Sequence, residues 1–411
     1  MRVLLSDFVL VCNDEFDIIK DGGVCFDEKI LEIGNSDVLL AKYKNAEVEK
    51  LPKNSVLMPG LVNAHVHLEF GANVATLKYG DFMEWLKSVI SSREELSGKC
   101  TEAVISASLE KMLKDGVTTI GAVSSFGLDM KACIKTPLNT VYFVEAIGSN
   151  PAAIDALFAD FKSRYYEAKE AKTNSFTPAV SVHSPYSTHP ILARRVLDIA
   201  KNDGAAVSAH FMESAHERKW LDSASGAMGE FMKNFNPRAK PMTTAIEFLE
   251  LFRDVKTLFI HAVWARDDEL KLISGQKNAV VHCPRSNALL GTGALDIKRA
   301  QKALVPLTLG TDGLSSNINL NLWDEMRAAL FTHQTFALGG LAVLLLKAAT
   351  CEGAKALGLN KGVLESGFDA DIIALELAEV PCDISDIALH TILQTKTARR
   401  IFISGKEIQN R

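Results

Sequence analysis

The chain has 411 residues, enough for one large domain or for two ordinary ones. Its composition is 47% hydrophobic and 23% charged, a balance that excludes an intrinsically disordered or low-complexity protein. The 45 basic and 50 acidic residues give a net charge of −5 without a basic tract, which argues against a nucleic-acid partner. Seven cysteines lie scattered without C-x-x-C spacing, and the apolar runs are too short to span a bilayer. We therefore expect a cytoplasmic protein with reduced thiols and no membrane partner.

The two ends of the chain share one pattern. Residues 1–55 contain short alternating runs, such as VLLSDFVLV and KILEIG, separated by Asn, Asp and Gly. Residues 361–411 repeat this pattern in GFDADIIAL and RRIFISGKEI. Such runs are typical of β-hairpins. We predict that the two segments pair into one small β-sandwich domain, with two separate edge pieces as the alternative.

Between these ends, short β-branched runs alternate with helical stretches. The predicted strands are Val56–Val66, Val117–Val123, Val141–Ile147, Ala179–His183, Ala206–Phe211, Thr257–Val263, Ala279–Cys283 and Val305–Thr311. Helices are predicted over Glu102–Lys114, after a Thr101 cap, and over Ile191–Lys201, between Pro190 and Gly204. Near-continuous apolar strands that alternate with helices indicate a parallel sheet buried on both faces. The prediction for residues 56–360 is therefore an α/β fold, a (β/α)8 barrel of the TIM type.

Histidines gather at the predicted strand ends, which in such a barrel meet at one face. The polar residues there are His65, His67, His183, His210, His261, His282 and Asp312, with Glu213 three residues beyond His210. Residues two apart on a strand point to the same side, so the imidazoles of His65 and His67 face one place.

Imidazoles and one carboxylate on a common axis are ligands for a divalent ion. The predicted ligands are His65, His67, His210, His261 and Asp312, which hold one ion per chain and leave a position for water. Zn²⁺ fits this donor set best, and Fe²⁺ or Mn²⁺ are the alternatives. A lone histidine at a strand end is more often an ordinary polar residue, so the prediction depends on the combination across five strands.

Several segments resemble the amidohydrolase superfamily, and within it the branch of adenosine- and guanine-deaminase-like enzymes. They are MPGLVNAHVH, HFMES, VHCPRSN, GTDGLSSN and GFDADIIAL followed by ISGK, and they extend over almost the whole chain. The resemblance implies that His65, His67, His210 and Asp312 hold the metal, and that His261 is a ligand or lies close to it. It also implies that Glu213 moves protons and that His282 contacts the attacking water.

Two details qualify this resemblance. Members with two metals carry a bridging Lys or Glu near the fourth strand, where this chain has His183, so a single ion is implied. The family's usual H-x-A-E-T is His-Phe-Met-Glu-Ser here, which keeps the spacing from His210 to Glu213. For hydrolytic deamination of an amino-purine, Asp312 would accept the proton of water and Glu213 would protonate the ring nitrogen. The alternative for Glu213 is a carboxylate that only orients a ligand.

Substrate contacts are also implied by the resemblance. In relatives that deaminate adenosine derivatives, a Trp and a Glu at matching distances from the H-x-H pair line the nucleoside pocket. Trp85 and Glu94 match these offsets, Glu94 for the ribose hydroxyls, and His183 matches a further contact. The alternative is that Trp85 belongs to the core of an amphipathic helix and that Glu94 lies on a solvated face.

Short matches such as FDEKILEIG and NAHVHLEF are similar to the aminodeoxyfutalosine deaminases of bacterial menaquinone synthesis. They imply a nucleoside substrate, 6-amino-6-deoxyfutalosine, whose aromatic carboxylate needs a cation; Lys78, Arg93 and Arg285 are the candidates. The alternatives are a deaminase of adenosine, 5′-methylthioadenosine or S-adenosylhomocysteine, a guanine deaminase or chlorohydrolase, and a non-catalytic binding barrel. The sequence leaves a homo-oligomer open.

Overall fold

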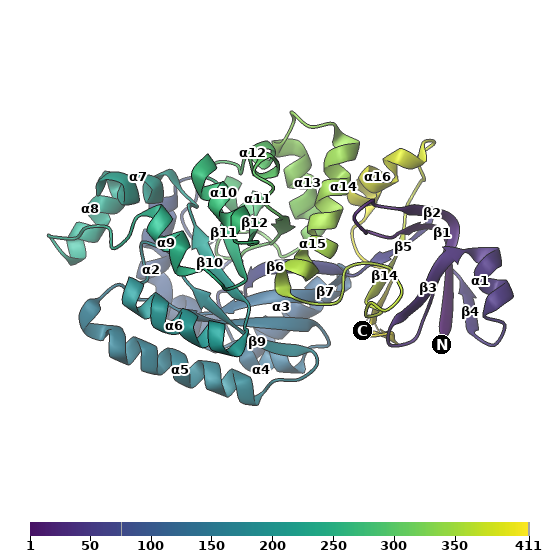
Figure 1. The fold of residues 1–411 in the computed structure, drawn as a ribbon, viewed down its shortest axis with the longest axis horizontal. Helices are drawn as coiled ribbons and strands as arrows, with labels where there is room; N and C mark the ends of the chain where they lie inside the picture. Colours follow the sequence, from purple (N-terminus) through teal and green to yellow (C-terminus); the bar gives the residue numbers. More distant parts are fainter. Residues whose placement is uncertain (75, 410–411) are drawn as a thin grey trace.

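The computed structural model of the protein describes residues 1–74 and 76–409 and contains two eight-stranded sheets. One sheet joins both ends of the chain in the order β16-β15-β14-β5-β1-β2-β3, with β4 beside β1. Its strands are β1 (Arg2–Leu10), β2 (Ile18–Phe26), β3 (Ile30–Asn35), β4 (Glu47–Lys50), β5 (Ser55–Pro59), β14 (Ile372–Glu376), β15 (Arg400–Ile403) and β16 (Lys406–Glu407). Both chain ends lie at this sheet, to one side of the larger body (Figure 1).

The predicted hairpins at the two ends are confirmed, because β1 and β2 pair antiparallel, as do β15 and β16. Two separate edge pieces, the alternative, are wrong, because β5 pairs with β1 on one side and with β14 on the other. The division into a β-sandwich domain over 1–55 and 361–411 stays a prediction. Within the C-terminal segment, α16 (Ile387–Gln394) lies against the barrel helices α13 (Leu322–Thr332) and α14 (Leu338–Ala348).

The second sheet is the predicted (β/α)8 barrel. Its strands pair in parallel and in chain order: β6 (Leu61–His67), β7 (Val117–Ser124), β8 (Asn139–Ala146), β9 (Phe176–Val182), β10 (Val207–Phe211), β11 (Thr257–His261), β12 (Ala279–His282) and β13 (Leu307–Leu309). The seam between the last strand and the first is bridged by the amides of Thr311 and Asp312, which donate to the carbonyl of His65 at 3.1 and 3.2 Å. A Cβ atom at Gly310 would lie 2.9 Å from the His65 Cβ, so this close approach requires glycine.

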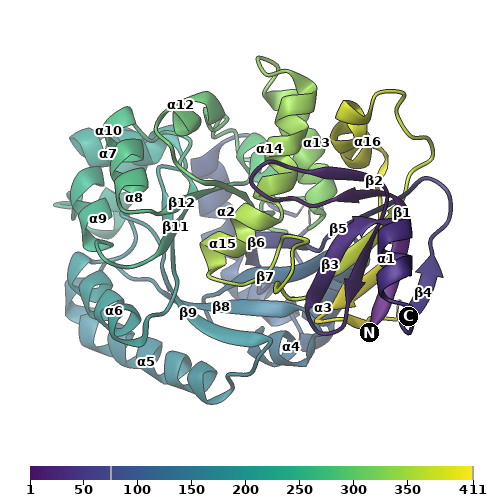
Figure 2. The same cartoon turned by 45° about the vertical axis from the view of Figure 1, so that its right-hand side comes forward.

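Helices cover the outside of the barrel, as α5 and α6 do over β8 and β9 (Figure 2). The remaining bounds are α1 (Ser36–Lys42), α2 (Phe82–Lys99), α3 (Glu102–Lys114), α4 (Met130–Lys135), α5 (Ile154–Glu170), α6 (Pro190–Asp203), α7 (Ala215–Ser223), α8 (Gly226–Phe235), α9 (Ala245–Leu251), α10 (Asp267–Gly275), α11 (Pro284–Leu289), α12 (Ile297–Lys302) and α15 (Cys351–Leu357), with 3-10 turns η1 (Pro151–Ala153) and η2 (Ile384–Asp386). As predicted, the Thr101 hydroxyl caps α3, and Gly204 ends α6 in the left-handed conformation. Among the described residues, no helix combines the length and the apolar character needed to cross a membrane.

The single strand predicted over 56–66 is wrong. It is two strands, β5 and β6, which belong to different sheets and are separated by Gly60. A Cβ atom at position 60 would lie within 2.7 Å of three side-chain atoms of Thr118, so the chain can pass from one sheet to the other only with glycine there. Because both strands are buried almost throughout, the run of apolar residues carries no sign of this change.

Candidate metal centre and active site

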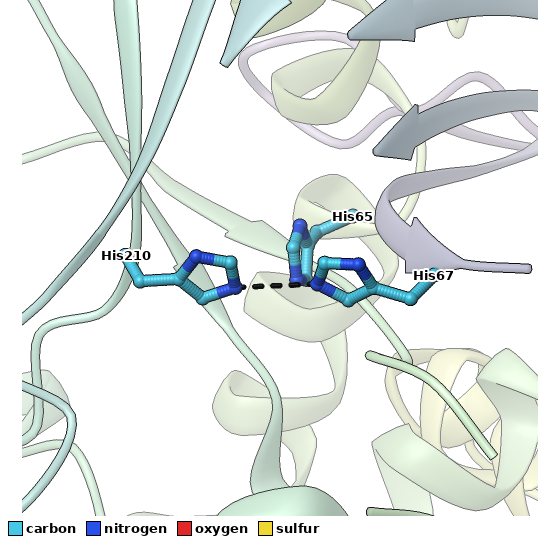
Figure 3. A group of neighbouring side chains, drawn as sticks. All are labelled: His65, His67 and His210. Carbon is cyan, nitrogen blue, oxygen red and sulfur yellow. Dashed lines mark hydrogen bonds between the residues drawn. The ribbon is translucent and has the colours of Figure 1, made fainter. Parts of the chain in front are cut away.

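Three imidazoles meet at the C-terminal mouth of the barrel (Figure 3). His65 and His67 come from the end of β6, and His210 approaches from β10. The Nε2 atoms of His67 and His210 lie 3.3 Å apart, and one ring nitrogen of each of the three residues lies within 4.8 Å of the others. Both ring nitrogens of His65 are buried without a hydrogen-bond partner among residues 1–74 and 76–409.

Two of the site histidines are oriented through Nδ1. That atom contacts the His183 carbonyl at 3.1 Å in His210, and the Asn287 Oδ1 at 2.9 Å in His261. Each Nδ1 therefore acts as the donor and leaves the lone pair of Nε2 directed into the site. Burial lowers the pKa of His210 well below its usual range and that of His261 to about 4. Both imidazoles are thus neutral near pH 7, the form that binds metals.

Asp312 supplies the carboxylate of this site. Its Oδ1 lies 3.5 Å from the Nε2 of His65 and 3.7 Å from the Nε2 of His67. Its Oδ2 accepts hydrogen bonds from the hydroxyls of Ser286 and Ser316 at 2.7 and 2.8 Å. Burial by itself would raise the pKa of Asp312, but the neighbouring imidazoles hold that pKa well below its usual range. The carboxylate is therefore ionised.

Glu213 lies on the other side of His261, with Oε1 3.5 Å from the imidazole Nε2. The buried Glu217 carboxylate accepts the backbone amides of Met212 and Glu213 at 3.0 and 2.8 Å, which fixes the turn after β10. Burial, reinforced by the charges of Asp312 and Glu217, raises the pKa of Glu213 well above its usual range. Near pH 7, Glu213 is therefore an acid with a proton to give.

Left-handed backbone conformations direct these side chains. Met212, His261 and Asp312 have φ angles of 49°, 72° and 56°. Non-glycine residues rarely adopt this conformation, which costs roughly 1–3 kcal/mol each and clusters at functional sites. Each of the three residues lies at or just beyond a strand end, so the chain turns there sharply.

The donor set fits a divalent ion. It combines imidazole nitrogens whose lone pairs converge, as at His67 and His210, with the ionised carboxylate of Asp312. The two buried nitrogens of His65 lack any other partner among the described residues. The residues that would hold the ion are therefore His65, His67, His210 and Asp312, with His261 beside them.

Not all predicted site residues join this group. The Nε2 of His282 contacts the Nε2 of His333 at 3.1 Å, and its Nδ1 is buried without a partner in the described part of the chain. Trp85 Nε1 donates to the Ser315 carbonyl at 2.8 Å, which ties α2 to the loop after Asp312. Glu94, also on α2, is exposed. The roles of His282, Trp85 and Glu94 stay predictions.

Sequence reasoning missed two residues. Glu145 ends β8, and its carboxylate lies with a ring nitrogen of His183 and of His210 in a second group within 4.8 Å. His333 follows α13 and contacts His282. Neither residue belongs to a motif; the one available signal was the position of Glu145 at a strand end.

Comparison with known proteins was consistent over nearly the full length. The model of the amidohydrolase family matches residues 56–408. Aminodeoxyfutalosine deaminase of a Nitratiruptor species is 45% identical over 390 residues, 95% of this chain and 96% of the relative. Adenosine deaminase of Helicobacter pylori is 36% identical over 99% of both chains. The crystal structure of Helicobacter pylori aminofutalosine deaminase in complex with methylthio-coformycin aligns over the whole of both chains, with a TM-score of 0.94 and 34% identity.

Proposed function

Because the chain belongs to the amidohydrolase family, we propose that it is a metal-dependent hydrolase that removes the amino group of an adenine nucleoside. The observation that carries this proposal is the pair of carboxyl groups on either side of His261. The environment lowers the pKa of Asp312 and raises the pKa of Glu213, so one is a base and the other an acid near pH 7. Two carboxyl groups whose pKa values are driven apart in this way are suited to acid–base chemistry.

The reaction needs each of these groups. A divalent ion, which we propose to be Zn²⁺, supplies Lewis acidity that makes water a usable nucleophile at neutral pH. Asp312 accepts one proton from the water as its oxygen adds to C6 of the purine, and Glu213 donates a proton to N1. Asp312 then passes its proton to the departing amino group, the C6–N bond breaks, and ammonia leaves. The proton of the new C6 hydroxyl returns to Glu213, which restores the acid and leaves the 6-oxo purine. His282 is proposed to hydrogen-bond the attacking water.

The proposed substrate is 6-amino-6-deoxyfutalosine, converted to futalosine and ammonia. The 45% identity to aminodeoxyfutalosine deaminase over most of both chains supports this choice. Trp85 is proposed to line the purine side of the pocket, Glu94 to bind the ribose hydroxyls, and His183 to make a further contact with the substrate. The bond from Trp85 to Ser315, close to Asp312, is consistent with that role.

Arg93 is the proposed partner of the substrate's aromatic carboxylate. The two other cations are engaged, because Lys78 lies 3.6 Å from a Glu84 oxygen and Arg285 lies 3.7 Å from the buried Glu325. The guanidinium of Arg93 lies 4.6 Å from the ring centroid of Phe126, so cation and aromatic face adjoin, as an aromatic carboxylate requires.

Adenosine is the second candidate substrate, favoured by the 36% identity to a relative named adenosine deaminase. Ammonia release from 6-amino-6-deoxyfutalosine, adenosine, 5′-methylthioadenosine and S-adenosylhomocysteine on one preparation separates the candidates. We expect the highest kcat/KM for 6-amino-6-deoxyfutalosine. A kcat/KM no higher than that for adenosine would reject this substrate and keep the deaminase. No ammonia from any nucleoside, at about one ion per chain, would reject the deaminase.

A further inference from the structure

Glu145 is a buried carboxylate with an unused acceptor. Its side chain is 1% exposed at the end of β8. Oε2 accepts a hydrogen bond from the Ser125 hydroxyl, but Oε1 is buried and has no hydrogen-bond partner among residues 1–74 and 76–409. Leaving a buried acceptor unpaired is unfavourable unless a ligand supplies the donor.

The position of this carboxylate adjoins the metal-binding residues. One of its oxygens lies within 4.8 Å of a ring nitrogen of His183 and of His210, and His210 also belongs to the group with His65 and His67. The Nδ1 of His183 is held by the Ser187 hydroxyl at 2.6 Å. The acceptor at Glu145 is therefore beside the place where the reacting base must lie.

The loop that holds Glu145 is itself fixed. Glu69, two residues after His67, accepts the backbone amides of Ser125 at 2.6 Å and of Leu128 at 2.8 Å. This keeps the Ser125 hydroxyl on Oε2 and so leaves Oε1 as the free acceptor. A binding group held in this way by neighbouring residues loses little freedom when a ligand arrives.

We propose that Glu145 binds substrate by accepting a hydrogen bond from one sugar hydroxyl of the nucleoside. The inference rests on the proposed function, because it takes an adenine nucleoside as the ligand. A carboxylate without a proton can only accept, and the ribose hydroxyls are neutral donors that match it. Glu94 approaches from α2 and Glu145 from the strand end, so the sugar would lie between two carboxylates.

A second metal ion is the rival occupant of this group. His210 cannot serve it, because its Nε2 faces His67 at 3.3 Å and its Nδ1 contacts the His183 carbonyl. Glu145 and His183 alone would remain, which is fewer than the three or more protein ligands usual for such an ion. The sugar hydroxyl is therefore the better match.

The test compares Glu145→Ala with wild-type protein on adenosine, 2′-deoxyadenosine and 3′-deoxyadenosine. A hydrogen bond to a charged group corresponds to roughly a 10- to 100-fold loss of kcat/KM on adenosine. The deoxynucleoside that lacks the partner hydroxyl should instead be turned over almost equally by variant and wild type. Glu145→Gln, which keeps the volume, should lose less than Glu145→Ala and serves if the alanine variant does not fold. Glu110→Ala, on an exposed face of α3, is the matched control.

Three results would overturn the inference: equal losses on all three nucleosides, reduced metal content in Glu145→Gln, or two ions per chain in the wild type that fall to one in the variant. Wild-type protein that releases no ammonia from any nucleoside would refute the proposed function instead. Calorimetric binding of inosine then decides about Glu145 separately. Equal affinities of wild type and Glu145→Ala for inosine would reject the role of Glu145.

Discussion

The Nε2 atoms of His67 and His210 face each other at 3.3 Å, although β6 and β10 are the first and fifth strands of an eight-stranded barrel. The two side chains therefore reach the axis from opposite walls. His210 uses Nδ1 to contact a backbone carbonyl, so its Nε2 carries a lone pair directed at the other ring. Lone pairs so arranged repel each other unless a proton or a cation lies between them, and the low pKa of His210 disfavours the proton.

Removal of a predicted ligand should remove the metal. His65→Ala and Asp312→Ala should give folded proteins with strongly reduced metal content and no deaminase activity, because each ligand contributes to a single site. Elemental analysis of the purified proteins, with circular dichroism to check folding, measures this. His390→Ala is the control, since that residue contacts Gln394 far along the chain from the site. Full metal content in either variant would contradict the proposed ligand set.

Glu213→Gln should separate proton transfer from metal binding. The amide keeps the shape of the side chain but cannot protonate the ring nitrogen, so kcat should fall by roughly 10²–10⁴-fold. Metal content should stay close to that of the wild type, and exposed Glu230→Gln should change neither quantity. Undiminished kcat at normal metal content would reduce Glu213 to a residue that orients its neighbours.

Arg93→Met should affect only the substrate that carries a carboxylate. The loss of one charge-assisted contact lowers kcat/KM for 6-amino-6-deoxyfutalosine by roughly 10- to 100-fold. The value for adenosine should stay unchanged, because methionine still covers the Phe126 ring. Lys78→Met is the matched control, and a selective loss in that variant instead would identify Lys78 as the tail partner.

Asp115→Asn should stabilise the protein at neutral pH. Burial raises the pKa of Asp115 from 3.8 to about 6, and its Oδ2 has no partner among the described residues. The folded state thus binds the proton more tightly than the unfolded state, and stability falls as the pH rises from 3.8 toward about 6. Asparagine does not titrate, so its advantage in the free energy of unfolding should grow up to pH 7 and reach about 1–2 kcal/mol.

Denaturant titrations of the metal-free protein at pH 5, 7 and 8 measure this difference without a contribution from the metal site. The exposed Asp268→Asn is the control. An advantage of Asp115→Asn that is the same at all three pH values would show that a contact, and not the titration, causes it.

Much of the fold and of the metal centre could be predicted because their signals repeat. Eight apolar runs separated by helices indicate the barrel, and the strand ends then place His65, His67, His210 and Asp312 at one face. The sheet change at Gly60 could not be predicted, since β5 and β6 are equally apolar. It depends on a contact with Thr118, which no local pattern encodes.

The residues that were missed depend on contacts between distant segments. Glu145 is one acidic residue in an apolar strand, and its importance comes from the positions of His183 and His210 on the next two strands. His333 is likewise defined only by its contact with His282. In contrast, the offset that selected Glu94 says nothing about exposure, and the structure leaves this side chain exposed on α2.

The seam of the barrel has a consequence for the order of folding. The amide of Thr311 donates to Asn63 Oδ1 at 3.1 Å, across 248 positions in the sequence. Contacts of such separation form slowly, because the intervening chain must first be brought together. During synthesis, β6 therefore waits with an unpaired edge until β13 has been made, and unpaired edges promote aggregation. The growing chain is thus most vulnerable through the strand that carries His65 and His67, long before those residues have a partner across the barrel.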